Sequence, residues 1–380
     1  MARGPEYKLI LTTDSGSRMY NPLSLQHGFT AMRKANTISP CSVNLNYRFG
    51  SKLFTVANPK EYMLQVWYKP PGGTMSLFNN YFITRFERSA TPTPEGSVTL
   101  MGYDANILLY RRIVAAYAAS TEARITEEAD DMLKTLLTNA QSDANDPTPT
   151  AGTRAWPGLT VGEKVTAGPS LTLDLERDEL LDFSGSGAFK QIVNASREAG
   201  TDLFFDVHPN DLQENSIDFM FDTYTGQIGR DLTDEITLSI GNNAIRNGKI
   251  VWDLSKAKNY IYGYGKGQDD LQTVVQSYDT DDYLRGKYTR SEGVYSAPST
   301  DDDSLQNATD AEIYDKRRTI KVTGDITDTP QLRYGRDYNF GDLITAKMFG
   351  DTFDAMITSV QIGLKINAEP ILKIGADYRS

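Results

Sequence analysis

The chain contains two histidines, the residue type most often used as a general base or as a metal ligand. His27 stands beside Gly28, and His208 precedes Pro209 in a predicted turn after a strand. Neither is accompanied by a cysteine pair, an HExxH motif or a GxSxG motif, on which zinc sites, metalloproteases and hydrolases depend. We therefore interpret both histidines as surface or turn residues, and we predict no catalytic residue, no metal ligand and no cofactor site.

A glycine-rich stretch and two acidic runs could bind phosphate or calcium. The stretch at 263–267 lacks the GxxxxGK[ST] spacing of a phosphate-binding loop, so it predicts the end of a strand followed by a flexible turn. The acidic runs at 279–282 and 301–303 lack the glycine and the distal glutamate of an EF-hand loop. We interpret 301–303 as the approach to a helix that Ser304 caps.

Close pairs of carboxylates are the remaining catalytic possibility. Asp174 with Glu176, and Asp178 with Glu179, could place two carboxyl groups about 5 to 10 Å apart, as glycosidases require. However, the chain has 50 acidic residues, so some close pairs are unavoidable, and nothing in the sequence indicates that one carboxyl is desolvated. A β-rich carbohydrate-binding or cell-wall-degrading protein is kept as an alternative.

Length and composition limit the fold class. A chain of 380 residues exceeds the roughly 250 to 300 residues at which one hydrophobic core stops growing, so two to four domains are expected. Hydrophobic residues make up 39% of the chain, and 21 tyrosines suit half-buried strands and subunit contacts. Cys41 is the single cysteine and is predicted to be a buried thiol outside any internal disulfide.

Charge is distributed unevenly along the chain. The net charge is −11, and residues 141–235 carry 18 acids and 6 bases, or −12, which leaves +1 for the rest. This balance argues against specific binding of duplex DNA, which needs clustered Lys and Arg. We expect part of the 141–235 acidity to face solvent or a channel. The longest apolar run, 107–119, is interrupted by Arg111 and Arg112, so neither a membrane span nor a signal peptide is predicted.

Strands dominate the first hundred residues. Alternating or apolar runs at 8–13, 43–47, 62–68, 81–88 and 96–103 predict them, and the intervals between the later runs are rich in Pro and Gly. Together they predict an antiparallel β-domain of about a hundred residues.

Helices are predicted next. Asp104 is expected to cap one, and a second is expected to begin near Thr126, whose hydroxyl could cap it ahead of several acids. Its apolar side chains form a one-sided stripe: Ala129, Met132, Leu133, Leu136 and Leu137. A polar, proline-containing linker at 139–158 follows.

The middle of the chain predicts a small α+β unit. The stretch 184–187 leads into a helix with an apolar face of Phe189, Ile192 and Val193, stopped by Gly200. Segments 203–207 and 216–224 predict a hairpin packed on this helix.

The last forty residues predict a β-barrel ending. Phe340, Gly341 and Asp342 form a turn, because Gly341 tolerates a positive φ and Asp342 can bond the nearby backbone. Strands are expected at 343–349 and 353–366, with a final one ending near 375. The fold class is therefore α+β and mainly β, with two β-barrel domains at the chain ends and α-containing domains inserted between them. The predicted parts are an N-terminal β-barrel domain at 1–103, a helical insertion and linker at 104–158, a small α+β domain at 159–235 and a C-terminal β-barrel domain with one helix, 304–317, at 236–380.

Several segments together resemble the tail-hub proteins of long-tailed bacteriophages, a family related to the N-terminal domain of tail-associated lysins. The segments are 9–18, 104–114, 123–138, 225–231 and 334–342 continuing to Gly375. Their order and spacing span most of the chain. The resemblance implies that the two β-barrel domains are tube-type domains, which continue the six-fold symmetry of the tail tube in a trimeric ring.

The resemblance also implies a place and a set of partners. It implies a homotrimeric structural protein of the virion, not an enzyme, at the distal end of the tail. There it would link the tail tube, the distal tail protein and the tape-measure protein to tip or fibre proteins, and it would gate the ejection of DNA that passes without sequence-specific binding. A hexameric distal-tail or tube ring protein is a second alternative.

Overall fold

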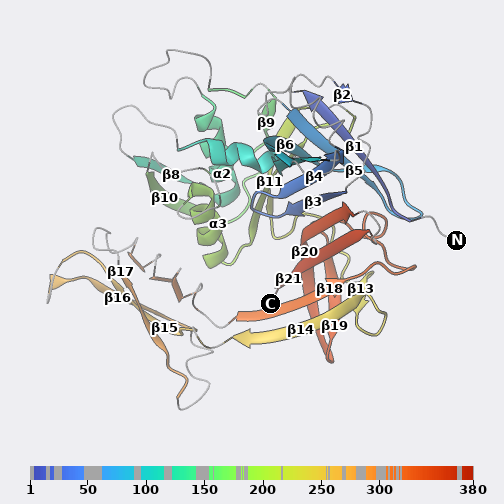
Figure 1. Cartoon of the computed structure of the whole chain (residues 1–380). Helices are drawn as coiled ribbons and strands as arrows, with labels where there is room; N and C mark the ends of the chain where they lie inside the picture. The colour runs from blue at the N-terminus through green and yellow to red at the C-terminus, as the bar shows by residue number, and fades with distance from the viewer. Residues whose placement is uncertain are drawn as a thin grey trace.

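In the residues that it describes, the computed structural model shows a chain built mainly from strands, as predicted, with two main helices (Figure 1). It describes residues 4–13, 18–20, 28–46, 62–89, 96–114, 122–142, 154–156, 158–176, 181, 183, 187–214, 217–253, 255, 257–267, 271–279, 288–296, 305–306, 309–310, 312–313, 316, 319–365 and 370–379. Among the helices in these ranges, none has the length and hydropathy needed to cross a bilayer.

The largest sheet takes strands from both ends of the chain. They are β1 (Glu6–Thr13), β2 (Arg18–Tyr20), β3 (Phe29–Lys34), β4 (Pro40–Asn46), β5 (Tyr62–Lys69), β6 (Ser76–Ser89), β7 (Ser97–Asp104), β13 (Thr237–Ser239), β19 (Leu343–Met348), β20 (Asp351–Leu364) and β21 (Ile371–Arg379). Their order is β13-β19-β20-β3-β4-β7-β6-β5-β1-β2, and β21 pairs with β20.

One antiparallel pairing, between β3 and β20, joins the two ends of the chain. Ala31 lies opposite Ile362, and Phe29 lies opposite Leu364. Alternate residues of these strands point into one hydrophobic cluster, in which Leu9 and Val43 pack with Ile344 and other C-terminal residues. The strands of both ends therefore share a core. The division into two separate barrel domains remains a prediction.

A second group of elements covers one side of this sheet (Figure 1). It comprises the 3₁₀ helix η2 (Ala105–Arg111), β8 (Glu122–Glu128), α2 (Ala129–Ala140), β9 (Leu159–Val161), β10 (Ser170–Glu176), α3 (Ala188–Glu198), β11 (Leu203–Pro209) and β12 (Phe219–Thr225). The predicted hairpin is confirmed, because β11 and β12 pair antiparallel. The apolar faces of α2 and α3 meet in a second hydrophobic cluster with Phe205 and Phe221. Strand β5 separates the two clusters, since Met63 belongs to the second and Leu64 to the first.

The predicted start of the second helix near Thr126 is wrong. Residues 122–128 form β8, which pairs along its whole length with β10, and the Thr126 hydroxyl lies 3.0 Å from that of Thr172. The helix begins at Ala129, with Asp130 and Asp131 in its first turn. The predicted apolar stripe is confirmed, since Met132, Leu133 and the other members are buried. Pairing with a strand that lies more than forty residues later outweighed the local capping signal.

Asp104 is also positioned differently from the prediction. It stands at the N-cap of η2, but its side chain makes no capping bond there. Instead, its Oδ1 accepts a hydrogen bond from the Ser39 backbone N–H at 3.1 Å. The carboxylate therefore joins two strand ends rather than stabilising a helix end.

The C-terminal part carries a projection that the sequence did not predict. Strands β14 (Ile245–Asp253) and β18 (Thr319–Ile326) pair with each other and lead to a separate three-stranded sheet of β15 (Tyr260–Tyr264), β16 (Val274–Tyr278) and β17 (Glu292–Ser296) (Figure 1). We call this sheet and the following helical residues at 305–306, 309–310, 312–313 and 316 the arm. The described residues of the predicted helix 304–317 are helical.

Candidate functional site

Among the described residues, His208 is not part of a catalytic group, and the glycine-rich stretch does not form a phosphate-binding loop. His208 Nε2 lies 2.9 Å from Asp222 Oδ2, and its Nδ1 lies 3.1 Å from the Pro209 carbonyl, so its ring is held in a structural hydrogen-bond pair. Strand β15 ends at Tyr264, inside the glycine-rich stretch at 263–267, as predicted. His27 lies outside the described residues.

Most of the acidic candidates lie outside the part of the chain that the structure describes. Asp178, Glu179 and the run 301–303 lie outside the described residues, and so do the side chains of Asp174 and Glu176. Of the run 279–282, only Asp279 is described. Within the described part of the chain, no group of three or more Asp, Glu, His or Cys side chains could hold a metal ion.

The predicted turn at Phe340, Gly341 and Asp342 is present and tightly built. Gly341 has φ +87°, in the left-handed region that glycine adopts without a steric penalty. The Asp342 carboxylate is buried, and its Oδ2 accepts a hydrogen bond from the Asn339 N–H at 2.8 Å. The chain then enters β19 at Leu343. The positive φ of Gly341 and the backbone bond of Asp342 are thus both present, as the residue types predicted.

The same turn docks on the loop at 227–230, more than a hundred residues earlier in the chain. Asp342 Oδ1 accepts from the Arg230 N–H at 2.8 Å, and Oδ2 pairs with Arg230 Nη2 at 2.9 Å. The Gly229 N–H donates to the Gly341 carbonyl at 2.9 Å. A Cβ atom on Gly229 would lie 2.7 Å from the Asp342 nitrogen, and one on Gly341 would lie 2.7 Å from Ile228 Cβ. Both glycines are required for this close backbone approach.

Phe340 extends the contact to the first third of the chain. Its ring lies under the Arg33 guanidinium, with 4.4 Å between Cζ and the ring centroid, in cation–π geometry. Arg33 Nη2 in turn donates to Asp206 Oδ2 at 2.7 Å. We call Arg33, Asp206, Arg230, Phe340 and Asp342 the junction, because they link the N-terminal strands, the hairpin and the C-terminal turn.

Two asparagines hold strand β11 against the sheet beside this junction. Asn36 Nδ2 donates to the Leu203 carbonyl at 3.0 Å, and its Oδ1 accepts from the Phe205 N–H at 2.9 Å. Asn106 Oδ1 accepts from the Val207 N–H at 2.8 Å. Side chains thus satisfy the backbone of β11, which is an edge strand of its described sheet.

Asp104 lies in the same buried polar network. Asn106 Nδ2 bonds Asp206 Oδ1 at 3.2 Å, which brings the Asp206 charge near the Asp104 carboxyl. Burial, and secondarily the Asp206 charge, raises the pKa of Asp104 to about 7, although bonds from Ser39 and the charge of Arg33 oppose this shift. The network therefore holds a carboxyl that is partly protonated near neutral pH.

The outer face of the sheet around the β3–β20 pairing carries mainly uncharged side chains, with Lys34, Lys373, Arg85 and Glu87 at neighbouring positions. Cross-strand neighbours are Thr30 with Ser42, Ser42 with Met101, Asn44 with Thr99, Met32 with Gln361 and Pro40 with Tyr103. These side chains are half-buried or exposed, whereas the residues between them point into the core. Their strands also border a shallow groove of about 210 Å³. We call Thr30, Met32, Ser42, Asn44, Thr99, Met101, Tyr103 and Gln361 the uncharged face.

The family of the chain follows from a comparison with protein-family models. The model of the Siphovirus ReqiPepy6 Gp37-like protein family matches residues 78–372. The chain belongs to this family. The range includes β20, the turn at 340–342 and most of the junction. No curated protein matches this Gp37-like protein.

Solved structures share the fold of this Gp37-like protein over its whole length. A tail protein from Neisseria meningitidis MC58 is similar with a TM-score of 0.53 at 12% identity, covering 99% of this chain and 97% of that one. The 43 kDa tail protein of prophage MuSo2 from Shewanella oneidensis gives 0.55 at 10% identity, with 98% of each chain covered. The Francisella PdpA-VgrG complex gives 0.53 at 9% identity, with 100% of this chain and 55% of that chain covered.

These comparisons confirm the resemblance: the chain belongs to a siphovirus protein family and shares the fold of phage tail proteins. The network of Arg33, Asn36, Asn106 and Asp206 was not predicted from the sequence. Arg33 and Asp206 are 173 residues apart, and no local pattern links them. The contact between Arg230 and Asp342 did have a signal, because 225–231 and 334–342 both contributed to the resemblance.

Proposed function

We propose that this Gp37-like protein is the subunit of a trimeric hub that closes the distal end of a phage tail tube. The observation that carries the proposal is the single sheet in which β3 and β20 join the two ends of the chain. A ring of three such sheets would present six strand sets, N-terminal and C-terminal in alternation, to a six-fold tube. The junction would keep the two sets in register within each subunit.

The uncharged face supports a channel position for this sheet. DNA carries one negative charge per roughly 1.7 Å of duplex, so a basic wall would hold it through counterion release. The uncharged face offers hydroxyl, amide and thioether groups instead, and the charged side chains beside it, Lys34, Lys373, Arg85 and Glu87, are few and of both signs. In the proposed hub, this face lines the channel and lets the genome pass without sequence-specific contact.

The acidity of residues 141–235 fits the outside of such a ring better than its channel. Asp206 is buried against Arg33 of the same chain, so this acid faces neither solvent nor a channel. Asp211 and Glu163 are exposed. The group of elements that carries them covers the side of the sheet, as a domain decorating a tube would. We propose that it contacts the distal tail protein, and that the hub also meets the tape-measure, tip or fibre proteins.

Light scattering on the purified chain tests the subunit number. Three chains of 42.2 kDa give a mass of about 127 kDa, and six give about 253 kDa. The proposed hub predicts the first value. A mass near 253 kDa would support the hexameric distal-tail or tube ring protein instead, and a monomer at micromolar concentration would contradict both ring proposals.

A further inference from the structure

The sheet of the arm has one face covered by its own helix and one that is not covered by any described element. On the covered side, a Cβ atom at Gly263 would lie 2.0 Å from Thr309 Oγ1, so the helical residues pack directly on β15. Leu305 and Ile261 are buried there. On the other side, Val274, Tyr278 and Val294 are 52%, 48% and 64% exposed. A solvent-facing sheet surface normally carries polar side chains, so this composition calls for an occupant.

The strand register defines this surface. Its three cross-strand rows are Tyr278-Tyr260-Glu292, Gln276-Tyr262-Val294 and Val274-Tyr264-Ser296. We call these nine residues, together with Arg290, the aromatic face. The Tyr260 and Tyr278 rings are stacked, with centroids 5.6 Å apart and planes 12° apart, and the Tyr262 ring lies 5.0 Å from that of Tyr260.

A polar layer is fixed on top of these rings. The Arg290 guanidinium lies 3.9 Å above the Tyr260 ring centroid. Its Nε donates to Glu292 Oε1 at 2.6 Å, and its Nη2 donates to the Tyr262 hydroxyl at 2.9 Å. These bonds use two of the five N–H donors of a side chain that is 42% exposed. Donors and acceptors are thus held in place beside aromatic rings before any ligand arrives, which lowers the entropy cost of binding.

The size of the aromatic face argues against a large protein partner. Strands of five residues are about 17 Å long, and three of them span roughly 14 Å, which gives about 240 Å². A standard protein interface buries about 800 Å² on each partner. The face is therefore suited to a ligand of one to a few small rings.

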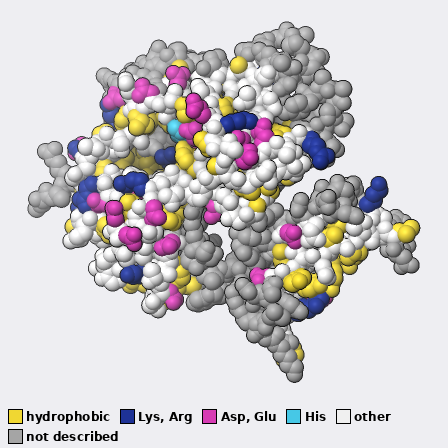
Figure 2. Space-filling model, turned by 180° about the vertical axis from the view of Figure 1, so that it is seen from behind, with side chains coloured by type: hydrophobic (Ala, Val, Ile, Leu, Met, Phe, Trp, Pro, Cys, Tyr) yellow, Lys and Arg dark blue, Asp and Glu magenta, His cyan; other side chains and the backbone are white. Residues whose placement is uncertain are grey.

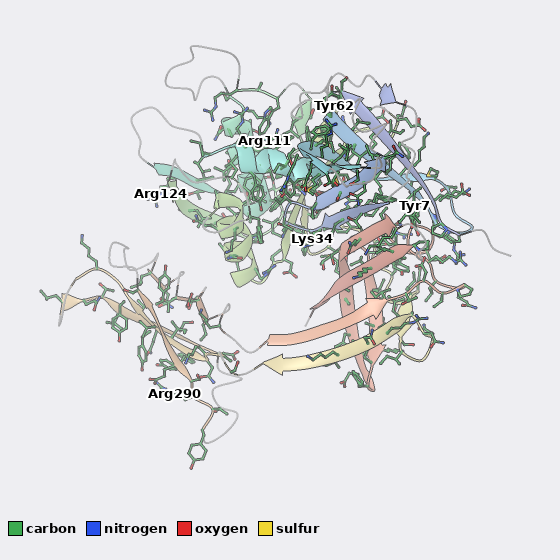
Figure 3. The ribbon with its side chains drawn as sticks, in the orientation of Figure 1. Tyr7, Lys34, Tyr62, Arg111, Arg124 and Arg290 are labelled. Carbon is green, nitrogen blue, oxygen red and sulfur yellow. The ribbon has the colours of Figure 1, made fainter. Side chains whose placement is uncertain are left out.

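We propose that the aromatic face binds a neutral saccharide, such as a segment of a bacterial surface glycan. A sugar ring combines an apolar C–H face with an edge of hydroxyl groups. The C–H face would pack on the exposed Tyr278 ring and on Val294, and the hydroxyl groups would bond Arg290, Glu292 and Gln276. The arm extends away from the large sheet, and Figure 3 shows Arg290 on it, far from Tyr7. Apolar side chains are visible on its surface in Figure 2.

Binding of the full-length protein to an array of bacterial surface glycans tests this proposal, followed by dissociation constants on the strongest glycan. Wild type is expected to bind at least one neutral glycan. Tyr278→Ala and Arg290→Ala should each weaken that binding at least tenfold, whereas Tyr278→Phe, which keeps the ring, should bind within about threefold of wild type. The matched control is Arg85→Ala, because Arg85 also pairs with a glutamate two residues later, at 2.8 Å, but lies on β6.

Three results would overturn the saccharide site. The first is the absence of binding to every glycan of the array. The second is equal binding by wild type, Tyr278→Ala and Arg290→Ala, and the third is an equal loss with Arg85→Ala. A protein that binds wild type but not Tyr278→Ala, in the absence of glycan binding, would assign the face to a protein contact instead. Circular dichroism of each variant establishes that the strands are retained.

Discussion

Replacement of Asp104 by Asn should change how the stability of the protein depends on pH. Asp104 is 1% exposed and accepts a hydrogen bond from the Ser39 N–H. Its pKa is raised from 3.8 to about 7, first by burial and then by the charge of Asp206. The folded chain therefore keeps this proton to near neutral pH, whereas the unfolded chain releases it near pH 4.

The sign and size of the effect follow from this difference. Because the folded pKa is raised, the folded state binds more protons than the unfolded state between pH 4 and pH 7, and stability falls as pH rises through that window. Each pKa unit corresponds to about 1.4 kcal/mol, so the ionised Asp104 lowers the free energy of unfolding by roughly 4 kcal/mol above pH 7. Between pH 5 and pH 8, roughly 3 kcal/mol of this loss takes place. Asp104→Asn removes this dependence, because an amide does not titrate.

Urea denaturation of wild type and Asp104→Asn at pH 5 and pH 8 measures the effect. From pH 5 to pH 8, the free energy of unfolding of wild type should fall by about 3 kcal/mol more than that of the variant. At pH 8 the variant should be the more stable protein, by less than the full 4 kcal/mol, because one buried amide hydrogen without a partner costs about 1 to 3 kcal/mol. Asp351→Asn, at an exposed strand end, is the control and should follow wild type. Equal losses in wild type and Asp104→Asn would refute the reasoning.

Three further predictions concern the turn and the core. Asp342→Ala removes the acceptor of the Arg230 and Asn339 backbone N–H groups and should cost about 1 to 3 kcal/mol in urea denaturation. The exposed Asp351→Ala should cost under about 0.5 kcal/mol, and equal effects would contradict the turn geometry. Gly341→Ala should destabilise by about 1 to 3 kcal/mol more than Gly350→Ala, because both have a positive φ but only Gly341 would place a Cβ against the neighbouring loop. Cys41 is buried, and burial raises the pKa of its thiol, so a thiol reagent should modify it only after the protein unfolds. Rapid labelling of the native protein would contradict this burial.

Local features of the fold could be predicted from the sequence because their causes are local. The turn at Gly341 and Asp342 depends on one positive φ and one short side chain, and both are readable from residue type. The apolar stripe of α2 follows from residue spacing and is buried as expected. The start of α2 could not be predicted, because β8 pairs with β10 and this pairing is not visible in either segment alone.

The arrangement of the two chain ends had no local signal. Strand β20 pairs with β3 across more than three hundred residues, and no residue pattern in either strand indicates its partner. The junction depends on the same pairing, because Arg33 at β3 reaches both Phe340 and Asp206 only when β3 lies beside the C-terminal turn. The uncharged face likewise becomes one surface only through the order of the strands.

An electron cryomicroscopy map of the assembled ring tests the proposed hub most directly. The proposed hub predicts three copies around a channel, with Thr99, Met101 and Gln361 of the uncharged face on the channel wall and the elements around α2 and α3 outside. A ring of six equivalent copies, or a trimer in which the uncharged face points away from the axis, would contradict it.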